Sequence, residues 1–172
     1  MRTSPKDSPL TTTRTEKLEL RPFAPADQPA IIALIDSIYT EYGDRICLEN
    51  CDSDLLDIAA NYAAGRFMVL LERGPLYGTV AVKPNPEHPG ACYLKRLYLH
   101  SDLRGGPWAD LMLDWAIDAT RELGMTRIEG WSDTRFTRAH SFYAKHGFTQ
   151  GGTRTMNDGW APYQEFYFSR VI

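Results

Sequence analysis

Apolar residues recur along the chain at two spacings, every second residue in short runs and every third or fourth in longer ones. These spacings predict β-strands and amphipathic helices, respectively. Strands are predicted at 18–21, 67–72, 76–82, 91–99, 126–132, 148–156 and 163–171. Helices are predicted at 28–42, 53–64 (capped by Asp52 or Ser53), 107–123 and 138–146. The helix 107–123 carries Leu111, Met112, Trp115 and Leu123 on one side and acidic residues on the other, which is typical of a helix packed on a sheet.

The order of these elements predicts an α/β (α+β) fold. The two strands within 67–82 are separated by Arg73-Gly74-Pro75, which favours an antiparallel hairpin. The strand–helix–strand unit 91–132 favours a parallel pair with a right-handed crossover. We therefore expect one domain over residues 16–172, with a mixed central sheet of six to seven strands and helices on both faces. Residues 1–15, rich in Ser, Thr and Pro, are expected to form a flexible leader.

Composition argues against several classes of protein. The formal net charge is −3 and long basic runs are lacking, which argues against nucleic acid as a partner. Apolar runs stay well below the roughly 18–20 residues of a membrane span, and residues 1–15 lack the apolar centre of a secretory signal. We therefore expect a cytoplasmic protein. Cys47 and Cys51 have no second Cys/His pair nearby, so with Cys92 they are expected to be reduced thiols, and no metal site is predicted.

The segment 95–109 carries the clearest chemistry. It consists of a strand, an Arg104-Gly105-Gly106 turn and a helix that begins near Pro107. The first N–H groups of a helix have no partner within it, and the positive end of the helix dipole lies behind them, which is typical of a phosphate or pyrophosphate site. Pro107 has no N–H group. It is either a helix-starting proline that removes one donor among several, or the mark of a cofactor site that has decayed.

Two motifs together resemble the GNAT superfamily of N-acetyltransferases. The first is the strand 94–99 followed by the turn, in which Arg104 and Ala109 match the family pattern Arg/Gln-x-x-Gly-x-Gly/Ala. The second is AHSFYAKHGF at 139–148, which matches the family's Ala-x-x-x-Tyr-x-x-x-Gly-Phe. Because both motifs occur in family order within the expected succession of elements, the chain is identified as a small bacterial-type member of this superfamily. The resemblance implies the acyl-CoA N-acyltransferase fold.

The resemblance also implies acetyl-CoA as cofactor. The activity implied is transfer of an acetyl group to a primary amine of a small molecule or peptide by direct attack in a ternary complex, without a metal. The CoA pyrophosphate would bind the turn, and the pantetheine arm would pair with the preceding strand. Phe136 stands where the family often has asparagine. The cofactor-binding residues that follow are Leu97, Tyr98, Leu99, Arg104, Gly105, Gly106, Trp108, Ala109, Asp110, Phe136, Ala139 and Phe142.

The candidate catalytic residues are Tyr143 and Glu129. Tyr143 matches a family tyrosine that lies near the cofactor sulfur, where its phenol can protonate the leaving thiolate; the alternative is a buried tyrosine that packs beside Phe142. The strand 93–96 lacks an acidic residue, so Glu129 on the next strand is the candidate general base. The alternatives are a water that relays the proton, Glu41, Asp44, Glu49, Asp133 and His140.

The candidate acceptor-binding residues are Tyr39, Tyr42, Arg96 and Arg135. Either arginine can form a two-pronged contact with a carboxylate, which suits an amino acid or a similar metabolite; the alternative is a surface salt bridge. A monomer or a homodimer is expected. The runner-up function, from a different class, is a CoA-binding sensor or interaction domain without transferase activity, which Pro107 and the missing acid on strand 93–96 motivate.

Overall fold

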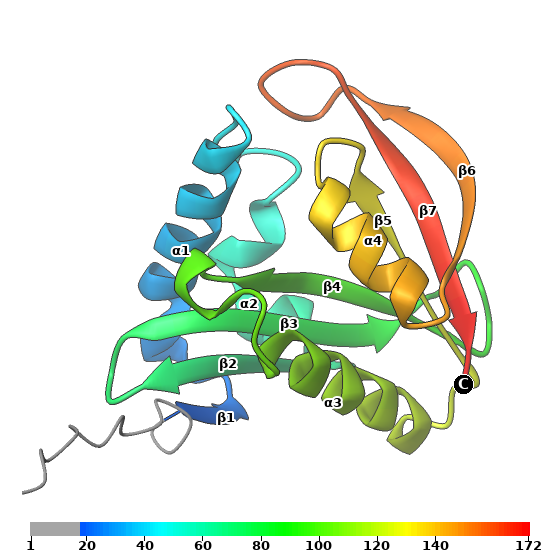
Figure 1. Cartoon of the computed structure of the whole chain (residues 1–172), viewed down its shortest axis with the longest axis horizontal. Coiled ribbons are helices and arrows are strands. Elements are labelled where there is room, and N and C mark those ends of the chain that lie inside the picture. The colour runs from blue at the N-terminus through cyan, green and yellow to red at the C-terminus, as the bar shows by residue number, and fades with distance from the viewer. Residues whose placement is uncertain (1–17) are drawn as a thin grey trace, which may run out of the picture.

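A computed structural model describes residues 18–172, so the predicted leader at 1–15 lies outside the described residues. These residues form a mixed seven-stranded sheet in the order β1-β2-β3-β4-β5-β7-β6 (Figure 1). Only the β4–β5 pair is parallel among the described strands, as the sequence predicts. The strands are β1 (Leu18–Pro22), β2 (Arg66–Glu72), β3 (Leu76–Pro84), β4 (Ala91–Leu99), β5 (Arg127–Asp133), β6 (Thr149–Met156) and β7 (Tyr163–Val171).

Helices lie on both faces of this sheet because its central strands bury side chains on both. On β3, Val80 and Val82 pack into the cluster that contains the apolar side of α3, whereas Ala81 packs into the cluster that contains α1. The expected arrangement of the sheet between helices is confirmed. The helices are α1 (Gln28–Glu41), α2 (Ile58–Asn61), α3 (Trp108–Glu122) and α4 (Thr137–Lys145), with 3₁₀ turns η2 (Pro25–Asp27), η3 (Ser53–Leu56) and η4 (Ser101–Leu103).

The single helix predicted for 53–64 is wrong. The chain forms η3, breaks at Asp57 with φ −146°, and restarts as α2, where the Asp57 side chain accepts the Ala60 N–H at 3.0 Å. Asp52 does not cap a helix, because its carboxylate instead accepts hydrogen bonds from Arg96 and Tyr39. Tertiary contacts thus override the local helical pattern here.

The strands β4 and β5 separate after a short stretch of pairing. Their register pairs run only from Ala91 with Arg127 to Tyr93 with Glu129. At the next position a Cβ atom on Gly130 would lie 2.9 Å from the Leu94 carbonyl oxygen, so only glycine fits there. Beyond this point the β5-facing edge of β4 has no strand beside it.

A β-bulge in β4 lies at the same level. Thr79 pairs with Tyr98 and Ala81 with Lys95, so the bulge holds Arg96 and the residue after it opposite one residue of β3. Arg96 has φ +55°, a conformation that is costly for a residue with a side chain and needs support from its surroundings. Part of that support is the Thr79 hydroxyl, which donates to the Arg96 carbonyl at 2.6 Å.

Candidate functional site

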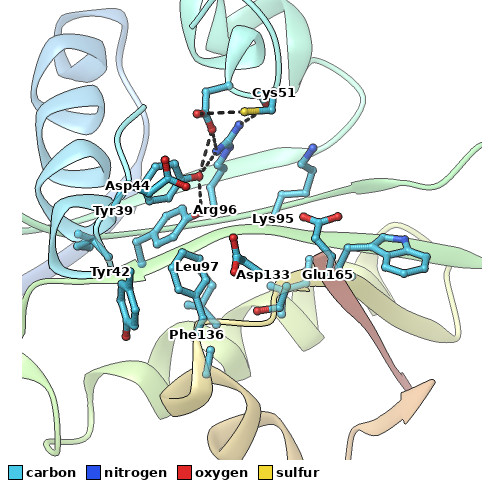
Figure 2. Close-up of a pocket in the computed structure, with 18 of the residues that line it drawn as sticks. Tyr39, Tyr42, Asp44, Cys51, Lys95, Arg96, Leu97, Asp133, Phe136 and Glu165 are labelled. Atoms are coloured by element: carbon cyan, nitrogen blue, oxygen red, sulfur yellow. Dashed lines mark hydrogen bonds and ion pairs between the residues drawn. The ribbon is translucent and has the colours of Figure 1, made fainter. Parts of the chain in front are cut away.

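A cavity of about 690 Å³ opens where β4 and β5 part. Its walls come from β4, β5, β7, α4, the loop after α1 and the β6–β7 loop (Figure 2). The predicted site residues that line it are Tyr39, Tyr42, Arg96, Leu97, Tyr98, Leu99, Arg104, Gly105, Ala109, Phe136, Ala139, Phe142 and Tyr143. One cavity therefore brings together most of the residues that the sequence analysis had selected for three different roles.

The turn before α3 directs free amides to one end of this cavity. Helix α3 begins at Trp108 with Pro107 as its N-cap, so Pro107 starts the helix as expected. Within residues 18–172, the amides of Gly105, Trp108, Ala109 and Asp110 have no hydrogen-bond acceptor. Four N–H groups beside the positive end of a fifteen-residue helix make a suitable site for a diphosphate.

Not every predicted donor of the turn is available. The Gly106 N–H donates to the Leu103 carbonyl at 3.4 Å, and the Arg104 N–H donates to Ser101 at 3.2 Å. The expectation that Gly106 keeps a free amide is therefore wrong, because the η4 turn uses it. Gly106, Trp108 and Asp110 also lie outside the cavity wall. Trp108 and Asp110 can therefore contact an anion through their main-chain amides but not through side chains that line the cavity.

Side chains fix the position of the turn. The Arg104 guanidinium donates to the Leu99 carbonyl at 3.0 Å and to both carboxylate oxygens of Glu41 at the end of α1. Asp110, in the first turn of α3, lies 2.7 Å from His146 at the end of α4. The turn is thus fixed to β4, α1 and α4, and Arg104 serves this purpose with its side chain.

Tyr143 presents its hydroxyl group to the cavity. Its ring packs on Phe148 and Phe168 with centroid distances of 5.3 and 5.2 Å. The hydroxyl has no hydrogen-bond partner, yet among the described residues every fully buried side-chain polar atom has one, so this oxygen lies at the cavity surface. Burial of the ring raises the pKa of the phenol well above its ordinary value of 10.0, so the phenol stays protonated at neutral pH.

Aromatic rings form the wall between α1, β4 and α4. Phe136 lies 4.7 Å from Tyr42, 6.0 Å from Tyr39 and 6.5 Å from Tyr98, measured between ring centroids. The Tyr39 and Tyr98 hydroxyls are 2.9 Å apart. Phe136, in place of the asparagine that the family often has, therefore supplies an apolar surface.

Arg96 is not available to an acceptor. Its side chain is 6% exposed, and all five of its N–H donors are used inside the protein. Asp54 accepts two of them, Asp52 one, and the Tyr39 hydroxyl and the Cys51 carbonyl the remaining two. The expectation that Arg96 binds a substrate carboxylate is wrong, because the carboxylates of this chain already occupy it.

Arg135 is similarly occupied. Its guanidinium contacts both oxygens of Asp133 at 3.0 and 2.6 Å and Asp44 at 2.5 Å. The residue borders a smaller cavity next to the main one and not the main one itself. The expectation for Arg135 as an acceptor-binding residue fails on position, because two carboxylates hold this partly exposed side chain outside the main cavity.

The expectation for Glu129 as general base also fails on position. Glu129 has 0% exposure and is absent from the cavity wall. Its carboxylate accepts hydrogen bonds from Asn85, His88 and Tyr167 at 2.5–2.6 Å. These bonds outweigh the effect of burial and hold the pKa of this carboxyl below its ordinary value. Glu129 is thus a structural anion that holds the β3–β4 loop and β7 to β5.

Sequence reasoning missed the residues at the far end of the cavity. Lys95, the residue before the bulge, lines it, as do Tyr163 and Trp160 from the β6–β7 region. The Trp160 indole N–H donates to the Ile46 carbonyl at 3.1 Å, so this loop reaches across to the loop after α1. The lysine was visible in the sequence, but its unpaired state was not.

The described part of the chain contains neither a metal-binding cluster nor a membrane-spanning helix. Residues 18–172 hold no group of three or more His, Cys, Asp or Glu side chains arranged to bind a metal. The helices in this range are all too short or too polar to cross a bilayer.

Comparison with known proteins decides the family. Residues 31–148 match the acetyltransferase (GNAT) family. The chain belongs to this family. It is also similar to an uncharacterised N-acetyltransferase of Schizosaccharomyces pombe, with 29% identity over 107 residues. That match covers 60% of this chain and spans 65% of the relative, slightly less than two thirds of its length.

Solved structures show that the GNAT chain has the fold of this family. A GNAT acetyltransferase of Staphylococcus aureus Mu50 superposes with a TM-score of 0.78 at 19% identity, over 90% of this chain and 98% of that one. An acetyltransferase of Streptococcus agalactiae gives 0.76 at 18% identity, over 91% and 99% of the two chains. The yncA protein of Salmonella typhimurium, solved with its cofactor acetyl-CoA, gives 0.69 at 15% identity, over 90% and 94%.

Proposed function

We propose that this GNAT protein transfers an acetyl group from acetyl-CoA to a primary amine of a small molecule, by direct attack within a ternary complex. One observation carries the proposal. The free amides of Gly105 and Ala109 at the start of α3, the unpaired edge of β4 and the free hydroxyl of Tyr143 all border one cavity. They offer contacts for the diphosphate, the amide-containing arm and the sulfur of a single CoA molecule.

The residues present suit acetyl-CoA as the cofactor. The amides of Gly105, Trp108, Ala109 and Asp110 would hold the diphosphate at the start of α3. The edge of β4 at Leu97–Leu99 lacks a neighbouring strand and offers main-chain groups to the amides of the pantetheine arm, as an edge strand does to an added strand. Such contacts need no particular side chain, which explains why Pro107 and Phe136 can depart from the family pattern.

When bound, acetyl-CoA supplies an activated acyl group, whose C–S bond is exchanged for a C–N bond to the amine. Tyr143 then donates its proton, or a hydrogen bond, to the sulfur that leaves. Its raised pKa keeps that proton on the phenol throughout the neutral range. The aromatic wall around Phe136 gives this part of the cavity an apolar surface.

The attacking amine must lose a proton, and we assign that proton to solvent. Asp133 is held by Arg135, and Glu165 by Arg154 at 2.7 Å. Carboxylates that accept hydrogen bonds from arginine are weak bases. Glu129, Glu41, Glu49 and His140 are not part of the cavity wall, and Asp44 accepts a hydrogen bond from Arg135. Transfer through water is therefore the route that we assign.

The alternative is a CoA-binding sensor without transferase activity. The paired state of Asp133 and Glu165 favours it, as does the proline in the diphosphate turn. Both functions require CoA to bind, so binding alone does not separate them. Turnover of an amine distinguishes the transferase from the sensor.

Calorimetry with acetyl-CoA, followed by a thiol-release assay on a panel of small amines, tests the proposal. We expect micromolar binding and turnover of some amines. Tyr143→Phe should lower kcat about 10–100-fold with acetyl-CoA affinity unchanged, because general acids contribute on this scale or above. Ser141→Ala, on the exposed side of α4, is the matched control and should retain activity. Binding without turnover of any amine would favour the sensor, and absence of binding at millimolar acetyl-CoA would exclude both.

A further inference from the structure

Lys95 is a half-buried cation without an anionic partner. It lies on β4 immediately before the bulge and lines the cavity. Figure 2 shows its side chain on the same side of β4 as that of Arg96. Unlike Arg96, its ammonium group makes no hydrogen bond or ion pair with any residue of the described chain.

The charges that face Lys95 do not neutralise it. Arg96 and Lys83 repel its ammonium group, and Asp54 and Glu165 attract it. These two carboxylates are committed elsewhere, however, Asp54 to Arg96 and Glu165 to Arg154. Burial therefore lowers the pKa of Lys95. A buried charge without a neutralising partner is unfavourable, so an anion bound next to this ammonium group would stabilise its charged form.

The acidic residues of the cavity are poor partners for a cationic acceptor. Asp44, Asp52, Asp133 and Glu165 are each paired with an arginine of this chain, and Asp158 accepts a hydrogen bond from the Tyr163 hydroxyl. Lys95, by contrast, is a half-buried charge of the wall that has neither an opposite charge nor a hydrogen bond among residues 18–172, and its sign selects an anionic group on the ligand.

Lys95 also lies at a suitable distance from the proposed reaction. The thioester would lie beside Leu97, which belongs to the bulge and to the part of the β4 edge that has no described strand beside it. Two residues of a strand span about 7 Å, which is close to the length of a lysine side chain. An anion held by Lys95 would therefore be separated by only a few bonds from an amine that attacks at Leu97.

The far end of the cavity is bounded by two loops that contact each other. The Arg45 guanidinium stacks on Trp160 at 3.7 Å from the ring centroid, and the Trp160 N–H binds the Ile46 carbonyl. The Cys51 N–H donates to the Asp158 carbonyl at 3.3 Å. These contacts join the two loops that border the space beyond Lys95, which favours a small acceptor over a peptide.

From these observations we infer that the acceptor is a small amino acid-like molecule with a carboxylate a few bonds from its reacting amine, and that Lys95 binds this carboxylate. The inference rests on the proposed acetyltransferase function. It replaces two residues that the sequence suggested for this role: Arg96, whose donors are all used, and Arg135, which lies outside the main cavity. Lys95 is a cation that lines this cavity.

The test compares each amino acid with its own carboxamide, which keeps the amine and removes the charge. Methionine, phenylalanine and glutamine serve as probes, both in the thiol-release assay and by calorimetry with the CoA-bound protein. We expect the wild type to prefer the acid at least about 10-fold in kcat/KM for one or more pairs. Lys95→Met should abolish this preference by raising KM for the acid, with the carboxamide unaffected, and Lys95→Arg should restore part of it.

Lys145→Met is the control. Lys145 lies at the exposed end of α4 and is not part of the cavity wall, so this variant should keep the preference for acids. Equal treatment of acids and carboxamides by the wild type, or equal losses for both in Lys95→Met, would overturn the inference, as would failure of every probe to bind. Acid binding that depends on Lys95 without acetyl transfer would instead support the site and refute the transferase.

Discussion

Replacement of Glu129 separates a structural role from a catalytic one. In Glu129→Ala the donors of Asn85, His88 and Tyr167 lose their common acceptor, a carboxylate that itself has 0% exposure. Removal of one partner from a buried charged network costs about 3–5 kcal/mol of the free energy of unfolding. For a domain of this size, each kcal/mol lowers Tm by about 2–4 °C, so a decrease of about 6–20 °C is expected.

The pH dependence of this effect has a defined sign. The hydrogen bonds place the pKa of Glu129 below its ordinary value of 4.5. A carboxyl with a lowered pKa stabilises the folded state at pH values above its unfolded pKa and loses that contribution as pH falls through its folded pKa. The difference in Tm between wild type and Glu129→Ala should therefore be full at pH 7 and shrink below about pH 4.

Calorimetric unfolding at several pH values measures the stability, and thiol release at 25 °C measures the activity. The isosteric Glu129→Gln is the companion variant, and should lose less stability because it keeps the volume and one acceptor oxygen. Neither variant should change the acid limb of the kcat profile. A Tm within 2 °C of wild type, or a 100-fold fall in kcat with Tm retained, would refute the structural role.

Three further predictions concern the sheet and the loop after α1. Arg96→Met leaves two carboxylates without their partner and should lower the free energy of unfolding in urea by about 3–5 kcal/mol; a loss below 1 kcal/mol would contradict the buried pair. Gly130→Ala places a Cβ 2.9 Å from the Leu94 oxygen, so calorimetry should show a lower Tm together with weaker acetyl-CoA binding, and unchanged affinity would speak against the separation of β4 and β5 as the cofactor site. Burial beside Asp52 raises the pKa of Cys51 to about 12, so mass spectrometry after iodoacetamide at pH 8 should show alkylation roughly 100-fold slower than for free cysteine.

The elements that follow from local patterns were predictable from the sequence. Strand β4 begins and ends at Ala91 and Leu99 as predicted, because its mostly apolar run is bounded by a loop rich in Pro and Gly before it and by a turn after it. The start of α3 was predictable because Pro107 and the glycines before it act on neighbouring residues. The succession of these elements was enough to predict the mixed sheet and the Arg104-Gly105-Gly106 turn before α3.

Contacts between distant segments were not predictable. The partners of Arg96 lie 42 to 57 residues earlier in the chain, and those of Glu129 up to 44 residues away. A single sequence shows that these residues are charged but not which charge neutralises which. For the same reason the sequence did not single out Lys95. This residue matters because the charged residues around it are paired and its own ammonium group is not.

The ion pairs of Arg96 with Asp52 and Asp54 also limit how the segment that contains η3 and α2 can move. The elements η3 and α2 have only four residues each, too few for helices to be stable without support. Because Arg96 binds Asp52 and Asp54 from the centre of the sheet, this segment cannot open without leaving three charges unpaired. Its amide hydrogens should therefore exchange with solvent only in openings that also disrupt β4. An acceptor that binds here, as proposed, would meet a wall that is already ordered, so little conformational entropy would be lost on binding.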